Sequence, residues 1–163
     1  MSDPSPNAVP VFAVGFLLST LGYQSHAMWE ERLAPLGLTS RQAATLLHVA
    51  RAEGQSQLRL ARTLRIAPSR VVSLVDELEQ RGLLVRRGDP TDRRVRTLRL
   101  TVKGKAIVHT LTEVSDAHET WLLMALDDAE REHLLMLLKK IATGLGLSDT
   151  AHAGIAGPEW RRP

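Results

Sequence analysis

The sequence predicts a mainly α-helical fold with one small β-hairpin. Apolar residues recur at helical spacing over most of the 163 residues. Between residues 83 and 101 the period changes to the alternation typical of short strands, and Gly88, Asp89 and Pro90 break the chain between them. A hydrophobic fraction of 44% is enough to build one compact domain of this length.

Residues 8–34 are predicted to form a helix that is apolar around most of its circumference. Its apolar positions include Val11, Phe12, Val14, Phe16, Leu17, Leu18 and Leu21. One protomer of this size can hardly cover such a helix, because a helix that is apolar all round needs neighbours on more than one side. We therefore expect a homodimer that forms through the two ends of the chain. The alternative is a monomer that buries the helix by intramolecular packing alone.

Three shorter helices are predicted next. Thr39 and Gln42 form a capping-box pattern that starts a helix over 40–52, and Gly54 ends it. A short helix over 55–64 is expected to bury Leu58, Ala61 and Leu64. The third, over 68–81, begins with a proline at its first position and stops before a glycine. Its core stripe is predicted to be Val71, Leu74, Val75 and Leu78.

Two short strands follow, over 83–87 and 95–101. In the second strand we expect inward side chains to alternate with outward ones: Leu98 and Leu100 inward, Thr97 and Arg99 outward. The order helix, short helix, turn, helix and hairpin is that of a winged helix-turn-helix, with the hairpin as its wing.

Two further helices are predicted after the hairpin. Thr101 is predicted to be the N-cap of a helix that runs to about Ala125. Its apolar residues lie close to a heptad seam: Ile107, Leu111, Val114, Trp121 and Ala125. Asp127 and Glu130 form a second capping box. The helix that it opens has one apolar stripe: Leu134, Leu138, Ile141 and Leu145.

Positive charge is concentrated in the middle of the chain. Residues 51–100 hold twelve Arg and six Asp or Glu, a net charge of +6, whereas the whole chain carries +3. A basic block flanked by mildly acidic helices indicates a module that binds a polyanion. The alternative is a solvated surface on which arginines cluster by chance.

Several classes of function are excluded or disfavoured. The chain contains no cysteine, so disulfides, zinc-thiolate sites and thiol redox switches are excluded. The apolar run at 9–18 is too short to span a bilayer and lacks a basic segment before it, so we expect a cytoplasmic protein without a membrane partner. We find no catalytic triad, paired carboxylates or glycine-rich phosphate loop, and therefore expect neither an enzyme nor a cofactor.

Three motifs carry a specific resemblance: LVDELEQRGLL at 74–84, DRR at 92–94 and LRLT at 98–101. In this register, between helical ends, they resemble the MarR (multiple antibiotic resistance regulator) family of winged helix-turn-helix transcriptional regulators. The resemblance covers residues 8–146 as a single domain. It implies dimerisation helices at 8–34 and 102–146 around a DNA-binding module at 39–101, while residues 1–7 and 148–163 are expected to be flexible tails.

The resemblance implies a homodimeric repressor of a pseudo-palindromic operator in double-stranded DNA, relieved by a small-molecule ligand. Repression is the usual outcome in the family. The alternative is a winged-helix module for protein interaction, or for architectural DNA binding without ligand sensing.

The helix at 68–81 is expected to enter the major groove as the recognition helix. Because its core stripe is occupied by apolar residues, its first turns present Ser69, Arg70, Val72 and Ser73 outward. Arg70 can bind guanine O6 and N7 or a phosphate, Val72 suits a thymine methyl, and the serines can donate to phosphates or base edges. Ala67 replaces the usual capping serine, so the helix start lacks a side-chain cap.

The wing at 87–97 is expected to read the minor groove. A guanidinium enters a narrow groove at lower desolvation cost than an ammonium, which accounts for arginine without lysine. By resemblance, Arg94 is inserted and Asp92 orients it, while Arg93 and Arg96 contact phosphates; the alternative is that Asp92 only neutralises a crowded turn. The remaining basic residues of the hairpin, Arg86, Arg87 and Arg99, are expected on solvated or phosphate-contacting strand faces.

A ligand crevice between the dimerisation helices and the DNA-binding module is likewise implied by resemblance. Its polar and aromatic candidates are Tyr23, His26, Met28, Trp29, His48, His118 and Trp121. They suit a small aromatic or phenolic effector with one anionic group; the alternative is that they are core or dimer-interface residues. We expect no metal, because His109, Glu113 and His118 are spaced i, i+4, i+9 and do not share one helix face.

Overall fold

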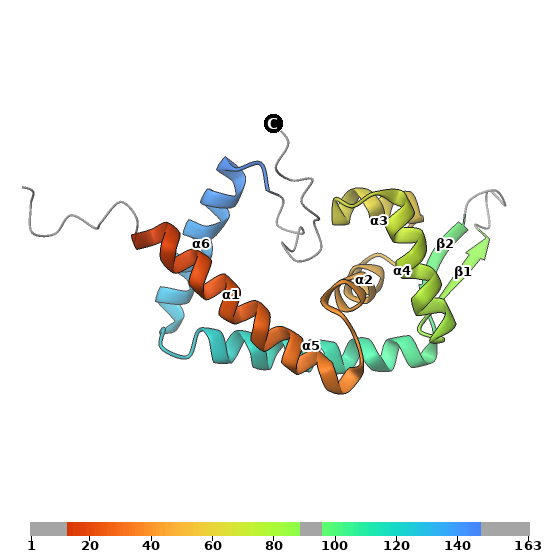
Figure 1. Cartoon of the computed structure of the whole chain (residues 1–163), viewed down its shortest axis with the longest axis horizontal. Coiled ribbons are helices and arrows are strands. Elements are labelled where there is room, and N and C mark those ends of the chain that lie inside the picture. The colour runs from red at the N-terminus through yellow and green to blue at the C-terminus, as the bar shows by residue number, and fades with distance from the viewer. Residues whose placement is uncertain (1–12, 89–95, 148–163) are drawn as a thin grey trace, which may run out of the picture.

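The computed structural model describes residues 13–88 and 96–147, and it confirms the mainly α-helical fold with one hairpin (Figure 1). Its elements in chain order are α1 (Ala13–Leu33), the 3-10 helix η1 (Ala34–Leu36), α2 (Ser40–Arg51), α3 (Gln57–Leu64), α4 (Pro68–Gln80), β1 (Leu84–Gly88), β2 (Arg96–Leu100), α5 (Val102–Leu122) and α6 (Asp128–Gly144).

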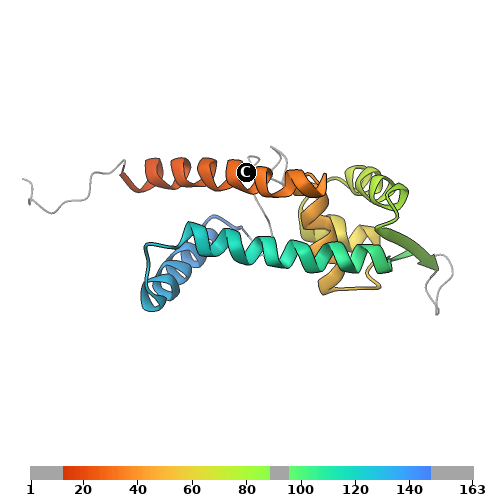
Figure 2. The ribbon, with the colours of Figure 1, turned by 90° about the horizontal axis from the view of Figure 1, so that it is seen from below.

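The molecule is elongated. The long helices α1 and α5 cross each other obliquely (Figure 1). The first half of α5 lies along a compact module formed by α2, α3, α4 and the hairpin, and its second half extends away from that module with the start of α1 (Figure 2). Helix α6 lies at the far end of α5 from the hairpin (Figure 1). None of the helices in the described part of the chain is long and apolar enough to cross a membrane.

The predicted starts of α2, α4, α5 and α6 are confirmed, whereas α3 begins at Gln57 and not at residue 55. Thr39 and Gln42 form a complete capping box at α2, and Asp127 and Glu130 form another at α6. At α5 the Thr101 hydroxyl accepts from the Gly104 backbone N–H at 2.9 Å. The start of α4 has a proline in its first turn and no side-chain cap, as predicted. These helix starts depend on local interactions, because each cap satisfies backbone N–H groups within three residues.

The hydrophobic core lies in the module and extends into both long helices. The predicted stripe of α4 is buried throughout, and the other fully buried large side chains are Leu33, Leu46, Val49, Leu60, Leu64, Leu83, Leu84, Leu98 and Leu111. Leu33 comes from the end of α1 and Leu111 from the middle of α5. The module and the long helices therefore share one core where they join.

The two strands pair antiparallel, from Leu84 opposite Leu100 to Gly88 opposite Arg96. The prediction that Thr97 points outward is wrong, because this residue is only 4% exposed. The segment before α3 lies along the free edge of β2: Leu98 N donates to Gln55 O at 2.9 Å, and Ser56 forms a bridge with Thr97. This third segment covers a side chain that a two-stranded hairpin would leave in solvent.

The predicted burial of Leu58 is also wrong, because Leu58 is 51% exposed. Helix α3 starts at Gln57 with Ser56 as its N-cap, and its buried residues are Leu60, Ala61 and Leu64. The centre of that face lies more than a quarter turn from Leu58 at helical geometry. Leu58 therefore lies in the first turn, beside the buried face.

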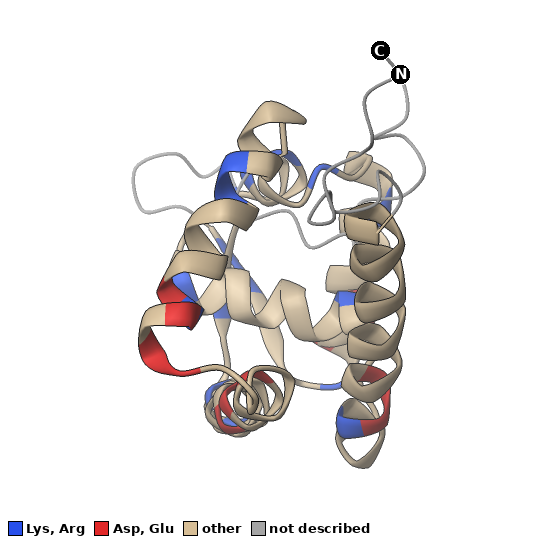
Figure 3. Ribbon diagram, turned by 90° about the vertical axis from the view of Figure 1, so that its left-hand side faces the viewer, with Lys and Arg blue, Asp and Glu red and all other residues tan. Residues whose placement is uncertain are grey.

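A large apolar surface remains uncovered at the end of the molecule away from the hairpin. Between Ala13 and Trp29, α1 carries no Lys, Arg, Asp or Glu (Figure 3). Its exposed apolar side chains are Val14, Phe16, Leu17, Leu18 and Leu21. On α6 the exposed ones are Leu135, Met136, Leu137, Leu138 and Ile141. Intramolecular packing within one chain thus leaves these faces in solvent.

The heptad seam predicted for α5 is only partly buried. Leu111 is fully buried, whereas Ile107, Val114 and Trp121 are half-buried. Ala125 is exposed and follows the end of α5 at Leu122, so the helix is shorter than predicted. On α6, Leu134 is half-buried and the rest of the predicted stripe is exposed. Residues 8–12, where the first helix was predicted to begin, lie outside the described residues.

Candidate nucleic-acid interface

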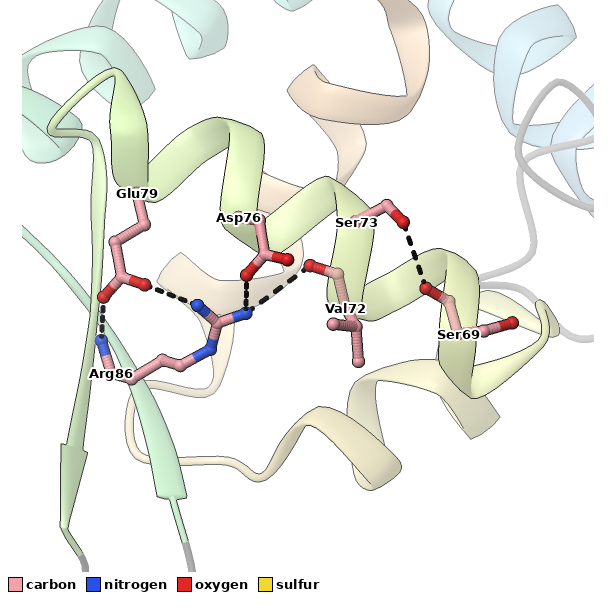
Figure 4. Close-up of polar contacts among 6 residues, drawn as sticks. All are labelled: Ser69, Val72, Ser73, Asp76, Glu79 and Arg86. Atoms are coloured by element: carbon pink, nitrogen blue, oxygen red, sulfur yellow. Dashed lines mark hydrogen bonds and ion pairs between the residues drawn. The ribbon is translucent and has the colours of Figure 1, made fainter.

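The first turns of α4 present the four residues predicted for DNA contact. Ser69, Arg70, Val72 and Ser73 are all exposed, with Val72 43% exposed. The Ser73 hydroxyl donates to the Ser69 carbonyl oxygen at 3.3 Å (Figure 4). No side chain caps this helix start, so its backbone N–H groups and the positive end of the helix dipole face the same solvent as these side chains.

The hairpin adds exposed cations beside this helix. Arg87 is exposed near the end of β1, and Arg96 is exposed at the start of β2, opposite Gly88. Arg99 is exposed on β2, as predicted. The predicted groove-reading residues of the wing, Asp92, Arg93 and Arg94, lie outside the described residues, and their roles stay predictions.

Helix α3 carries cations that the sequence interpretation did not single out. Arg59 and Arg62 are exposed on it, and Arg65 is exposed at its C-cap with a φ of 51°. In a helix-turn-helix the first helix crosses the phosphate backbone. The spacing of Arg59 and Arg62, i and i+3, would have placed both on one helix face from the sequence alone.

Arg86 is not on a solvated strand face, contrary to the prediction. Its side chain is only 20% exposed and lies against the C-terminal half of α4, where it forms ion pairs with Asp76 and Glu79 (Figure 4). The Arg86–Asp76 distance is 2.5 Å. These partners precede it by ten and seven residues in the chain, so only the packing of the hairpin onto the helix brings them together.

Part of the predicted ligand set forms an aromatic cluster between α1 and α5. The Trp29 and His118 ring centroids lie 5.5 Å apart in an edge contact, and those of His118 and Trp121 lie 5.9 Å apart. His118 Nε2 is hydrogen-bonded to Ser25 Oγ at 3.0 Å. Tyr23, in contrast, is 73% exposed.

The other predicted ligand residues lie nearer the module. His26 is 3.9 Å from the Glu30 carboxylate on the next turn of α1. His48 is half-buried on α2, and its carbonyl oxygen accepts from the Gln55 side chain at 3.0 Å. Met28 is half-buried on α1.

Two adjoining crevices lie at the surface between α2 and α4, and the first extends to α1. The first, of about 440 Å³, is lined by His26, Glu30, Thr39, Ser40, Arg41, Leu74 and Glu77. The second, of about 340 Å³, is lined by Arg41, Ile66, Arg70, Ser73, Leu74 and Glu77. The two crevices share Arg41, Leu74 and Glu77. Together they extend from His26, a predicted ligand residue, to Arg70 and Ser73, which are predicted to contact DNA.

A polar junction ties the C-terminal end of α4 to the segment that joins α1 and α2. The Gln42 amide donates to Glu77 Oε2 at 2.8 Å, and its oxygen accepts from Arg81 Nη1 at 3.2 Å. Arg81 also donates to the carbonyl oxygens of Leu36 at 3.1 Å and Gly37 at 2.8 Å. This junction, formed by Gln42, Glu77 and Arg81, connects α4 to α2 and to the segment that follows α1.

The histidines considered for metal binding are divided between two places. His109 Nδ1 lies 3.6 Å from Glu113 on an exposed face of α5, whereas His118 lies in the aromatic cluster. Within the described ranges, no group of three or more His, Asp or Glu side chains is arranged to hold a metal ion.

Comparison with known proteins places these features in context. A family model described as the MarR family matches residues 36–95. The structure of CouR from Rhodococcus jostii RHA1 bound to p-coumaroyl-CoA is 34% identical, with a TM-score of 0.70 over 80% of this chain and 92% of that chain.

Two similar structures contain DNA. The transcriptional repressor CouR bound to a 23-mer DNA duplex is 34% identical, with a TM-score of 0.72 over 79% of this chain and 92% of that chain. A mutant of MarR from E. coli complexed with operator DNA is 25% identical, with a TM-score of 0.70 over 82% of this chain and 99% of that chain.

Proposed function

This chain belongs to the MarR family of transcriptional regulators, and we propose that it is a homodimeric repressor that binds operator DNA and releases it when a small molecule binds. The observation that carries the proposal is the exposed first half of α4, which presents Ser69, Arg70, Val72 and Ser73 on a basic module. Because such a repressor acts on DNA, we expect it in the cytoplasm.

DNA binding is supported by how the cations are distributed. Exposed arginines lie on α3, on the first turn of α4 and at Arg87 and Arg96, where the strands approach the turn of the hairpin. A duplex could therefore contact α3 through its phosphates while α4 occupies the major groove. In this arrangement the segment at 87–97 reaches the minor groove, where Arg94 reads its width and charge. The two relatives whose structures contain DNA support DNA as the partner.

Dimerisation is supported by the uncovered apolar faces of α1 and α6. Side chains such as Phe16, at 70% exposed, and Met136, at 58%, are costly to leave in water on a monomer. Pairing two copies through these helices would bury both faces and place two recognition helices for one operator. An operator of this kind has half-sites about one helical turn apart.

Ligand relief is supported by the position of the two crevices. A ligand beside His26 and Arg41 would lie next to Arg70 and Ser73 without entering the hydrophobic core. The junction formed by Gln42, Glu77 and Arg81 would pass a displacement of α1 or α2 to α4. An aromatic acid or its thioester is the expected chemical class, since CouR binds p-coumaroyl-CoA and Arg41 in both crevices offers a cation for an anionic group.

Quantitative binding to DNA tests this function. The probe is the intergenic duplex upstream of the protein's own gene, with a scrambled duplex of equal composition as the control. We expect specific binding whose affinity falls by about 10³ to 10⁵ between about 50 and 200 mM salt, as for a dimer that neutralises roughly 6 to 10 phosphates. Equal binding to both duplexes would favour architectural DNA binding, and no binding to either would favour a protein-interaction module.

Ligand release is tested separately on the bound complex. A panel of phenolic acids and their coenzyme A thioesters is added, and both the melting temperature and the fraction of bound DNA are measured. We expect at least one compound to raise the melting temperature and release the duplex. If a compound raises the melting temperature while the duplex stays bound, the protein binds that ligand but the ligand does not release the DNA.

A further inference from the structure

The outward face of α4 carries two carboxylates beyond the residues assigned to DNA. Val72, Asp76 and Glu79 are spaced i, i+4, i+7 and so lie along one face of the helix. Val72 is 43% exposed, and the side chains of Asp76 and Glu79 are 49% and 37% exposed. Without compensation, both negative charges would stand beside the phosphates of any duplex that Val72 approaches.

Arg86 supplies the compensation from β1. Its guanidinium donates to Asp76 Oδ1 at 2.5 Å and to Glu79 Oε2, and also to the Val72 carbonyl oxygen at 3.4 Å (Figure 4). The backbone N–H of Arg86 donates to the second oxygen of Glu79 at 3.0 Å. One residue of the hairpin therefore meets three successive positions on the outward face of the recognition helix.

A role in stability alone would explain this arrangement poorly. Arg86 itself is only 20% exposed, but both of its carboxylate partners are reached by water, and ion pairs that water screens contribute little to the free energy of folding. The arrangement lowers the negative charge on the side of α4 that would face a polyanion, because the guanidinium of Arg86 lies between the two carboxylates. Its planar fork can bond two carboxylates at once, which a lysine ammonium does less well.

We propose that Arg86 is a positioning residue for DNA binding, which acts by neutralising Asp76 and Glu79 so that the outward face of α4 can approach the duplex. The inference rests on the proposed DNA-binding function, and it adds the residue that allows the acidic part of this helix face to approach DNA. The three residues together carry one negative charge. Removing the arginine leaves two, and amidating both acids leaves one positive charge.

The test uses the full-length protein and a duplex that the wild type selects from a random-sequence pool, with a scrambled duplex beside it. The variants are Arg86→Gln, the double variant Asp76→Asn with Glu79→Gln, and the triple variant that combines all three. Arg99→Gln is the matched control, because it removes the same charge from an exposed position of the neighbouring strand. Circular dichroism melting is recorded for each.

We expect Arg86→Gln to bind the selected duplex about tenfold more weakly than the Arg99→Gln control at about 50 mM salt, with a smaller loss at about 200 mM because salt screens the repulsion. The triple variant should return to within about threefold of the control, since the carboxylates no longer repel phosphate. The double variant should bind the scrambled duplex more tightly than the wild type does. A purely structural role would instead give a loss that is independent of salt and is not rescued.

The proposal is overturned if the triple variant stays as weak as Arg86→Gln, or if Arg86→Gln loses no more than the control. Should Arg86→Gln not fold, the double variant decides, because unchanged or weaker binding to the scrambled duplex contradicts charge neutralisation. If the wild type selects no duplex at all, the proposed DNA-binding function is refuted. If the wild type selects a duplex and the variants bind it as the control does, only the role of Arg86 is refuted.

Discussion

Gly104, in the first turn of α5, packs directly against the carbonyl group of Leu83, the residue before β1. A Cβ atom at Gly104 would stand 2.0 Å from the Leu83 oxygen. The same oxygen accepts from the Thr101 backbone N–H at 3.1 Å. The start of α5 is therefore held against the start of the hairpin by backbone contacts, and the absence of a side chain at residue 104 permits the approach.

Gly104→Ala is expected to destabilise the protein. Alanine normally stabilises a helix interior relative to glycine by up to about 1 kcal/mol. Here the added methyl group meets backbone, so overpacking should outweigh this gain and lower the free energy of unfolding by about 1–3 kcal/mol or more. Urea denaturation measures the change. Gly144→Ala on α6, where a Cβ meets nothing within 4 Å, is the control and should be neutral or stabilising.

Gln42→Ala is expected to cost more than the corresponding change in the second capping box. Gln42 is 8% exposed and bonds Glu77 and Arg81 besides closing its own box, whereas Glu130 closes its box in solvent. We expect a loss of about 2–3 kcal/mol for Gln42→Ala and about 1 kcal/mol or less for Glu130→Ala, from chemical denaturation. Equal losses would mean that the junction adds nothing to the cap.

The uncovered face of α6 is expected to hold a dimer together. Light scattering after size-exclusion chromatography should give twice the chain mass of 18.0 kDa for the wild type. Leu138→Glu should shift the protein to monomer, because a buried unpaired carboxylate is costly. Leu58→Glu, at a position 51% exposed on α3 and outside both dimerisation segments, should leave the dimer intact. A monomeric mass for the wild type would remove the dimer.

Arg94→Ala is expected to weaken specific DNA binding by more than about 1 kcal/mol, the lower end of the range for a specific contact. The loss should be greatest on operators whose wing-contacting flank is rich in A·T pairs, since a narrow minor groove attracts the guanidinium. Fluorescence anisotropy with A·T-rich and G·C-rich flanks measures both effects. If Arg94→Ala costs no more than Arg99→Ala on either flank, the minor-groove assignment is wrong.

Local chemistry made much of the fold predictable. The caps at Thr39, Thr101 and Asp127 each involve residues within one helical turn, and the buried stripe of α4 follows from its period alone. The DNA-contacting candidates lie on the opposite, exposed face of α4, so their exposure was predictable from the same helical period. Helix order and the hairpin followed from the same short-range signals.

By itself, the sequence determined which segments are helices and strands, where α2, α4, α5 and α6 begin, and which face of α4 is left for a partner, because these depend on interactions within a few residues. Tertiary structure alone decided that Thr97 is covered, that Leu58 is exposed and that Arg86 pairs with two acids of α4. Each of those outcomes depends on a segment brought close by the packing of the module, and no local pattern encodes which distant segment fills the space beside a given side chain.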